Sequence, residues 1–426
     1  MTKRLQFLSA GSTRREALAG AGAMLFAVPQ ARAFSLLVEP SATEPASAGG
    51  DLAEPARSPP PQPAPAPVVA ALRHVAETVA PALSRTAGGN LVLSSGSILS
   101  VVAALAGGRP DAARRGLPEE VRVSLALPAE ELRALLLPSA DSTLRAAGGL
   151  WHAPDLSLHP AFAAHVAGML GAVPQAVPSG ELAAIVNAWV ARETEGQIPR
   201  LLEDGAPNAR LIAASAVALR GRWGTRFEPE ATRPARFRPA AGGQVETPLM
   251  AVRLAASALL GRDMRAVMLP YAGGRYGFVA VRRTERSRTA PTLGQLYASV
   301  AALPDGSVAG TRWATRDVAV RLPRFTLEVG GDVADALSRG GYRAVIGTTL
   351  DAAATEPVLI REVIHKARIA VDEEGTTAAA ATAAVGIRTM APPPEELVFD
   401  QPFAFAVVDL ARRFPVFTGV LNAPPR

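Results

Sequence analysis

The side chains that most often carry out chemistry are sparse in this chain and lack the spacings of a known active site. There is no cysteine, no Gly-x-Ser-x-Gly segment to present a nucleophilic serine and no His-Glu-x-x-His pair to bind zinc. Gly273-Gly274 lacks the lysine of a phosphate-binding loop and is typical of a turn. The sequence therefore predicts no catalytic residues, no metal and no cofactor. The histidines are His74, His152, His159, His165 and His365.

The more informative chemistry lies in the backbone of residues 363–394. Ala367, Ile369 and Val371 alternate with polar or small residues, as in a half-buried strand. Glu373-Glu374-Gly375 follows, and then a run of small residues over 376–386 that has almost nothing to bury, so we expect an exposed loop there. The run contains no proline before Pro392 and can therefore also pair as a strand. The sequence predicts a loop that can become a strand.

Several motifs resemble those of the serpin family. Residues 373–382 (EEGTTAAAAT) are similar to the reactive-loop hinge of an inhibitory serpin, and residues 400–405 (DQPFAF) and 414–419 (FPVFTG) are similar to its C-terminal strands. Weaker likenesses occur at residues 187–190, 194–198, 218–223, 227–232, 267–271 and 322–325. The resemblance covers residues 68–424 and, with the N-terminal signal described below, is to a bacterial member of inhibitory type. It implies an α+β fold with large mixed and antiparallel sheets, surrounding helices and an exposed reactive loop.

The resemblance also implies roles for particular residues. The loop hinge would consist of Glu373, Gly375, Thr376, Ala378, Ala380 and Thr382. The sheet would open to admit the loop at Trp223, Arg324 and Glu373, where the arginine and the glutamate would form an ion pair. A hydrogen-bonded cluster beneath the sheet would contain Ser94, Ser97, Ser215 and His365.

Two peptide bonds remain candidates for the reactive-site bond. The hinge-to-bond spacing usual in the family, counted from Glu373, indicates cleavage between Thr389 and Met390. A loop one residue shorter would be cut between Arg388 and Thr389. A guanidinium suits the acidic specificity pocket of a trypsin-like protease, whereas threonine suits a smaller pocket. We favour Thr389–Met390, because the geometry of insertion is set from the hinge.

This sequence departs from the family pattern at four positions. Ser95 replaces a proline, Gly148 and Ser215 replace asparagines, and Val420 stands where a basic residue is common. Ser215 matters most, since a serine can still hydrogen-bond but reaches less far than an asparagine. The cluster under the sheet is therefore expected to be weaker, or bridged by water.

The N-terminus reads as an export signal and a spacer. Residues 1–33 combine a twin-arginine-like segment at Arg14-Arg15, a short apolar run and a small-x-small site at Ala31-Arg32-Ala33. Residues 34–67 are rich in proline and alanine, as in a polyproline spacer, and residues 68–426 would form the serpin-like domain. Without residues 1–33 the net charge falls from +6 to +2, which gives no footprint for nucleic acid.

Local patterns add some expected elements. Residues 90–98 read as a short buried strand followed by Ser97 as the N-cap of a helix through Leu105. An amphipathic pattern from Leu182 predicts a helix that ends near Gly196. Strand signals mixed with helices, without strict alternation, favour an α+β fold over a doubly wound one.

The sequence thus predicts an exported inhibitor that acts in the periplasm or outside the cell, with no stable membrane span. It would be a monomer that is consumed in a covalent complex with a target serine protease or, less well supported, a cysteine protease. Two alternatives remain: a non-inhibitory serpin-like chaperone or binding protein, and an enzyme with an unrecognised site.

Overall fold

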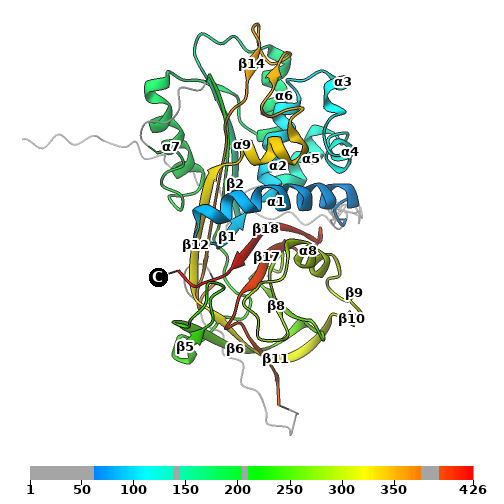
Figure 1. The fold of residues 1–426 in the computed structure, drawn as a ribbon, viewed down its shortest axis with the longest axis vertical. Coiled ribbons are helices and arrows are strands. Elements are labelled where there is room, and N and C mark those ends of the chain that lie inside the picture. The colour runs from blue at the N-terminus through cyan, green and yellow to red at the C-terminus, as the bar shows by residue number, and fades with distance from the viewer. Residues whose placement is uncertain (1–61, 138–143, 204–209, 376–392, 426) are drawn as a thin grey trace, which may run out of the picture. The chain divides into compact units, whose positions relative to one another are not determined.

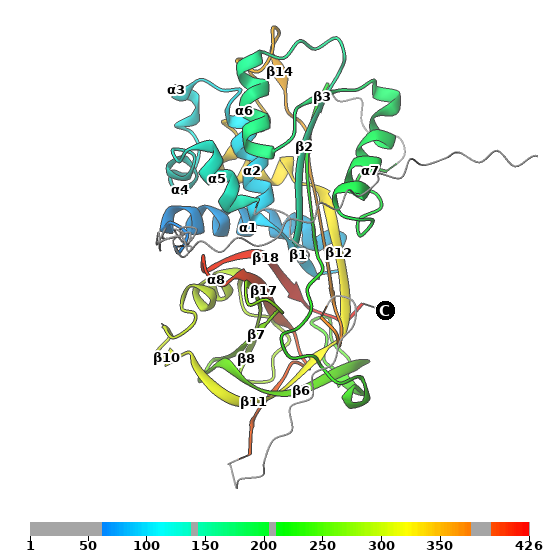
Figure 2. The ribbon, with the colours of Figure 1, turned by 180° about the vertical axis from the view of Figure 1, so that it is seen from behind.

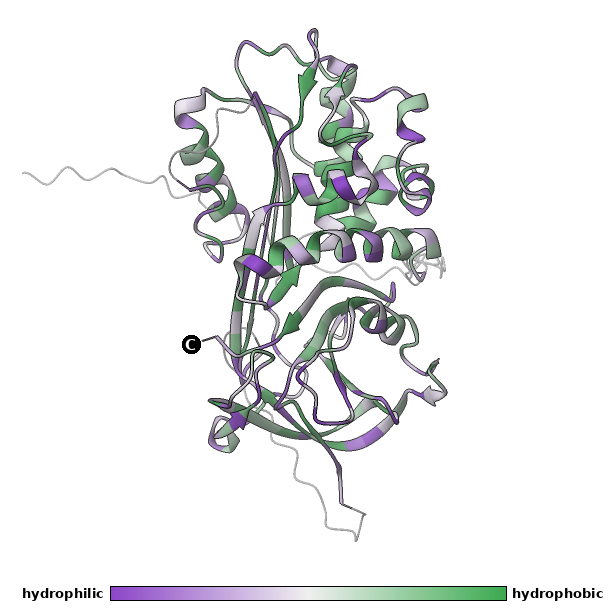
Figure 3. Ribbon diagram, viewed as in Figure 1, coloured by the Kyte–Doolittle hydropathy of each residue, from purple (hydrophilic) through white to green (hydrophobic). Residues whose placement is uncertain are grey.

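The computed structural model describes residues 62–137, 144–203, 210–375 and 393–425. Two large sheets dominate this part of the chain, and most of the helices pack around the smaller sheet (Figure 1). Hydrophobic residues are concentrated in the buried elements of the fold. Helix α2 and strand β17 are examples, and both are mostly green in Figure 3.

The smaller sheet has five strands in the order β12-β15-β4-β2-β3. β4 and β15 are parallel neighbours, whereas β12–β15 and β2–β4 are antiparallel. All nine residues of β4 are buried, as expected of a strand with both faces covered. The strands are β2 (Leu144–His152), β3 (Gln175–Ala176), β4 (Leu211–Leu219), β12 (Phe325–Asp332) and β15 (Val363–Val371).

Helices cover both faces of this sheet (Figures 1 and 2). On one face lies α2 (Ser95–Ala106), which is buried along its whole length, with α5 (Ala129–Leu136) and α6 (Pro160–Leu170) beside it. On the other face α7 (Leu182–Glu193) packs Val186 and Val190 against the small side chains of β4, Ala214, Ala216 and Ala218. The sheet is therefore sandwiched at its centre.

The larger sheet follows the path β1-β18-β17-β8-β7-β6-β11-β16, with β5 paired to β6. Helix α8 (Leu293–Ala301), which begins with a capping box of Thr292 and Gln295, packs on β17 and β18. The strands are β1 (Leu91–Leu93), β5 (Arg233–Phe237), β6 (Val245–Leu260), β7 (Met264–Pro270), β8 (Tyr276–Arg283), β11 (Ala314–Pro323), β16 (Glu395–Val398), β17 (Phe403–Asp409) and β18 (Phe414–Leu421).

The remaining elements are short, except for α1 (Ala66–Thr86), which contacts α2, α4 and α8. They are α3 (Asp111–Arg114), α4 (Glu119–Ser124), η1 (Ser179–Glu181), η2 (Pro229–Ala231), α9 (Ala334–Leu337), η3 (Ser338–Tyr342) and the strand pairs β9 (Ser307–Val308) with β10 (Thr311–Arg312) and β13 (Thr349–Leu350) with β14 (Val358–Leu359).

Two expected boundaries differ from the structure. The N-cap of α2 is Ser94 and not Ser97, because the Ser94 hydroxyl accepts a hydrogen bond from the Ser97 amide at 3.4 Å. Helix α1 begins at Ala66, inside the segment expected to be a spacer. A proline in the first turn, here Pro67, lacks an N–H that would otherwise need a partner. Residues 1–61, which contain the expected signal and most of the spacer, lie outside the described residues.

Candidate functional site

The candidate site lies where β4 and β15 run side by side. Ser215 faces His365 and Val217 faces Ala367 across this parallel pair. A strand placed between them would be antiparallel to both, and antiparallel pairing is slightly the more stable. The chain leaving β15 already turns in that direction, since Gly375 forms an antiparallel bridge with Arg222, beyond the end of β4.

Four backbone or indole contacts hold the chain where it leaves β15. The Trp223 amide donates to the carbonyl of Glu374 at 3.1 Å, and the Phe227 amide donates to that of Glu373 at 2.9 Å. The Trp223 indole N–H donates to the carbonyl of Asp372 at 2.8 Å. Together with the bridge at Gly375, these contacts fix residues 372–375 just beyond the carboxyl ends of β4 and β15.

Gly375 is required by this close approach. Its φ of +113° is one that residues with side chains rarely adopt, and an added Cβ would lie 2.3 Å from the carbonyl oxygen of Gly221. The glycine expected in the hinge therefore lets the backbone press against the segment that follows β4.

Glu373 lies where the sheet would open. Its Oε2 is 3.6 Å from Nη1 of Arg324, and its Oε1 accepts a hydrogen bond from Thr232 at 2.8 Å. The Glu373 side chain is 11% exposed and that of Arg324 is 53% exposed. The structure thus brings together the two charges that the sequence paired. It adds Thr232, which no sequence pattern indicated because it lies far away along the chain.

An aromatic cluster surrounds Trp223. The indole stacks on Tyr271 with ring centroids 4.7 Å apart, and it meets the edges of Phe227 and Phe278 at 5.7 Å. The Tyr271 hydroxyl has no hydrogen-bond partner among the described residues, and burial, with the nearby charge of Asp372, raises the pKa of Tyr271. These aromatic side chains are buried and make the surroundings of the Trp223 contacts apolar.

The four residues expected beneath the sheet are linked directly. Ser215 Oγ lies 2.9 Å from Nδ1 of His365, and the Ser94 amide donates to Nε2 of His365 at 3.2 Å. Because Nε2 accepts, the neutral ring carries its proton on Nδ1 and donates it to Ser215. Ser97 completes the group, since its hydroxyl donates to the Ser94 carbonyl at 3.1 Å.

Two departures from the family pattern have structural partners. The hydroxyl of Ser95 lies 3.0 Å from that of Tyr297 in α8, which ties α2 to the larger sheet's helix. Gly148 faces Ser215 across the β2–β4 pair, and Leu170 fills the space where a side chain at 148 would lie. Among the described residues, the side-chain hydrogen-bond partner of Ser215 is His365.

We expect acid to destabilise the protein through His365. Burial lowers the pKa of His365 to about 3. As the pH falls, the unfolded chain, in which this histidine has its ordinary pKa, therefore takes up a proton at a higher pH than the folded protein does. The contribution of His365 to the free energy of unfolding is then fully present above about pH 6.5. It falls by about 1.4 kcal/mol per pH unit between pH 6.5 and 3. Urea midpoints measured between pH 7.5 and 4.5 should show this slope. The slope should persist in His159→Gln and shrink in His365→Gln; an unchanged slope in His365→Gln would contradict the assignment.

A second feature links the two sides of the β4–β15 pair. Lys366 on β15 donates to the carbonyl of Arg200, in the turn after α7, at 2.7 Å. Asn187 of α7 accepts from the amides of Leu201 and Leu202 in the same turn. Because α7 packs on β2 and β4, this Lys366–Arg200 link joins β15 to the helix that covers its neighbours.

The remaining predicted site residues, Thr376, Ala378, Ala380, Thr382, Arg388, Thr389 and Met390, lie outside the described residues. Within the described ranges, no group of three or more His, Asp or Glu side chains is placed to hold a metal ion. No helix there is long and apolar enough to cross a membrane.

Comparison with known proteins decides the family. A model described as "Serpin (serine protease inhibitor)" matches residues 70–424. The chain belongs to the serpin family. Serpins are protease inhibitors and not enzymes, in agreement with the prediction from the sequence.

Individual relatives span plants and animals. Leukocyte elastase inhibitor from Sus scrofa is 30% identical over 274 residues, which cover 58% of this serpin and 67% of the relative. Putative serpin-Z6C from Oryza sativa subsp. japonica is 32% identical over 383 residues, which cover 79% and 91%.

Solved structures show the same fold. Native protease nexin-1, crystallised with heparin, superposes with a TM-score of 0.69 at 20% identity and covers 84% of this serpin and 100% of that chain. Tengpin, a thermophilic serpin in the native state, gives a TM-score of 0.65 at 21% identity, with 83% and 94% covered. The predicted α+β serpin fold is confirmed.

Proposed function

We propose that this serpin inhibits serine proteases by inserting its cut reactive loop between β4 and β15. The observation that carries the proposal is the antiparallel bridge of Gly375 with Arg222 just beyond the carboxyl end of a parallel strand pair. A target protease would attack a bond in residues 376–392 and form an acyl-enzyme. The freed segment would then continue the antiparallel pairing that Gly375 begins, a transition of the kind known for serpin loops.

The inserted strand needs side chains that fit beneath the sheet. With period-2 alternation, the inward positions are taken by Thr376, Ala378, Ala380, Thr382 and Ala384. None is large or charged, which matches the small residues of β4. About fourteen residues at 3.3 Å each span roughly 46 Å, so the tethered protease would be carried across the length of the sheet.

The new strand supplies the driving force. About a dozen ladder hydrogen bonds at 0.5–1.5 kcal/mol each contribute on the order of 10 kcal/mol. That free energy is available to distort the captured protease before the acyl bond is hydrolysed. Each inhibitor molecule would act once, as a monomer.

The cellular setting is part of the same proposal. Residues 1–33 would direct export through a twin-arginine-like signal, and residues 34–67 would act largely as a spacer. This serpin would then be a bacterial protein that works in the periplasm or outside the cell, on a protease of the bacterium itself or of another organism.

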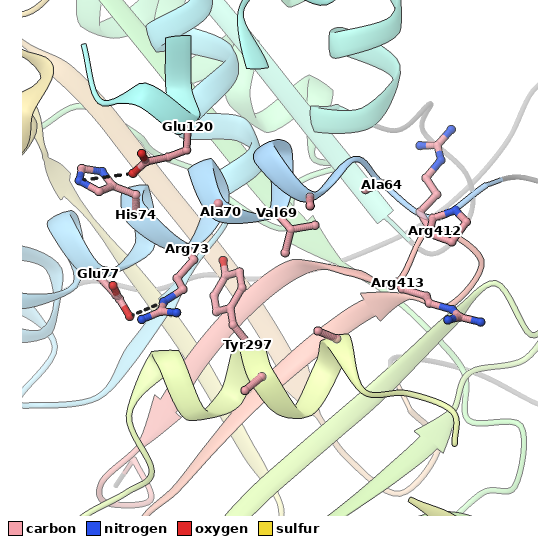
Figure 4. A pocket seen from close by; sticks show the side chains of 14 residues that line it. Ala64, Val69, Ala70, Arg73, His74, Glu77, Glu120, Tyr297, Arg412 and Arg413 are labelled. Atoms are coloured by element: carbon pink, nitrogen blue, oxygen red, sulfur yellow. Dashed lines mark hydrogen bonds and ion pairs between the residues drawn. The ribbon is translucent and has the colours of Figure 1, made fainter. Parts of the chain in front are cut away.

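A non-inhibitory binding role is the second candidate, and one pocket favours it. A pocket of about 670 Å³ lies between α1 and α8, with Val69 and Ala70 on its apolar wall and Tyr297 at its floor (Figure 4). Arg412 and Arg413, from the turn between β17 and β18, also line it. A carrier for a small, largely apolar ligand would use such a pocket without any change in the sheet.

One experiment separates these functions. The protein is incubated with a panel of serine proteases and run on denaturing gels. A complex that survives denaturation supports the inhibitor, clean cleavage without a complex supports the binding protein, and turnover of a substrate would support an enzyme and overturn both.

The same reaction identifies the reactive-site bond. We expect mass spectrometry of the released C-terminal fragment to show a chain that begins at Met390. A fragment that begins at Thr389 would show that Arg388 precedes the cut bond instead. Arg388→Ala gives an independent check, because it should abolish inhibition of trypsin only in that second case.

A further inference from the structure

Two arginines face each other directly in the larger sheet. Arg265 of β7 and Arg282 of β8 are partners in an antiparallel pair, so their side chains leave the same face of the sheet with Cβ atoms about 5 Å apart. Like charges placed directly opposite are destabilising. β7, β8 and β17 lie side by side in Figure 2. The next residue of this row, Phe403, packs against Phe399.

The two guanidinium groups are unevenly satisfied. Arg282 donates from Nη1 to the carbonyls of Arg283 and Thr284, at 2.8 and 3.1 Å. The side chain of Arg265 has no hydrogen bond or ion pair with any described residue, and the buried Nε atoms of both side chains lack an acceptor there. Burial and the charge of Arg265 both lower the pKa of Arg282, which is the sign expected for two cations in close proximity.

Little negative charge is available to offset them. Asp400 is near enough to raise the pKa of Arg282, but its carboxylate is already paired with Arg238 at 2.8 Å. Asp263 and Glu285 flank the strand ends, and the described contacts of both there are made by their backbone carbonyls. Asp400 therefore pairs with Arg238 and acts on Arg282 only through its charge.

The turn after β16 lies beside this arginine pair. Gln401 donates to the carbonyl of Arg283 at 3.0 Å, the same acceptor that Arg282 uses, and the Arg238 amide donates to the carbonyl of Asp400 at 2.9 Å. β16 itself is short and pairs only with β11 among the described strands, over four residues. Charge balance at the turn thus bears on how firmly this edge strand is held.

We propose that the Arg265–Arg282 pair binds a small oxyanion, such as inorganic phosphate or sulfate, and that the bound ion stabilises the folded protein by offsetting the repulsion between the two guanidinium groups across β7 and β8. Guanidinium groups donate to such oxygens in paired, charge-assisted hydrogen bonds. The ion would supply the acceptors that Arg265 lacks and remove the repulsion across the strands. This site is separate from the β4–β15 pair and does not depend on the proposed inhibition.

The test is thermal unfolding of the full chain in phosphate and in sodium chloride of equal ionic strength. We expect millimolar phosphate to raise the unfolding temperature saturably, by about 2 °C or more, beyond the effect of chloride. Arg265→Gln should abolish this increment. Because the variant lacks the repulsion between the two arginines, we also expect it to unfold about 2 °C higher than the wild type when both are measured without phosphate. A merely structural role for Arg265 would give the opposite sign in the absence of phosphate.

Arg262→Gln is the matched control, since it makes the same charge change at an exposed position in the turn just before β7, the strand that carries Arg265. It should keep the full response to phosphate. Equal responses to phosphate and chloride in the wild type would overturn the proposal, as would an undiminished phosphate response in Arg265→Gln. Calorimetric titration of phosphate into the wild type and into Arg265→Gln should show binding to the wild type and none to the variant.

Discussion

Thr382→Arg should convert the protein from an inhibitor into a substrate of its target protease. In the proposed inserted strand this side chain faces inward, beneath the sheet, where an unpaired charge costs several kcal/mol. Insertion would then be slower than hydrolysis of the acyl-enzyme. We expect the stoichiometry of inhibition to rise at least about tenfold, with the native fold unchanged.

Thr377→Arg is the control for this experiment, since period-2 alternation places it on the outward side of the same strand. It introduces the same side chain in place of the same residue and should still form the stable complex. If Thr382→Arg inhibited as well as Thr377→Arg, the inserted strand could not have the proposed register. Circular dichroism and thermal unfolding of the uncut proteins would show that neither change alters the starting fold.

Glu373→Lys should open the sheet prematurely. The change would replace the carboxylate that lies 3.6 Å from Nη1 of Arg324 with a second cation at a largely buried position, and it would remove the acceptor of Thr232. Because Arg324 is half exposed, water screens part of the repulsion, and we expect a loss of about 2 kcal/mol. The unfolding temperature should fall by about 4 °C. Mild heating should yield polymers or an inactive monomer with its uncut loop inserted.

Size-exclusion chromatography after heating, together with inhibition assays, would measure this outcome. Glu230→Lys is a suitable control because it reverses a charge on the exposed η2 turn, close to Thr232. A Glu373→Lys protein that stays monomeric and fully inhibitory would contradict the role proposed for the Glu373–Arg324 pair.

The parts of the fold that follow local patterns could be predicted from the sequence. The alternation of Ala367, Ile369 and Val371 matches the burial pattern of β15, and the motifs around Trp223, Glu373 and Gly375 indicated which residues meet where the sheet would open. These features depend on periodicity or on motifs that remain readable in one chain.

Other features depend on contacts between distant segments, which no local pattern encodes. Thr232 binds Glu373 and Ser95 meets Tyr297 only because the fold brings their elements together. The opposed Arg265 and Arg282 required the register of two strands. The prediction of Ser97 as the N-cap of α2 was wrong for a different reason. Serines at 94, 95 and 97 can all cap a helix, so only the backbone geometry decides among them.

The Lys366–Arg200 link has a consequence for timing. A strand inserted between β4 and β15 would move them about 5 Å further apart, while α7 stays packed on the β4 side unless it detaches. The hydrogen bond from Lys366 to the turn after α7 must therefore break, or the helix must lift, before the sheet can widen fully. In the proposed mechanism, trapping would require this widening to be faster than hydrolysis of the acyl-enzyme. The packing of α7 would thus limit the rate of loop insertion. Proteases that deacylate slowly would form the stable complex, and proteases that deacylate fast would cleave the loop and dissociate.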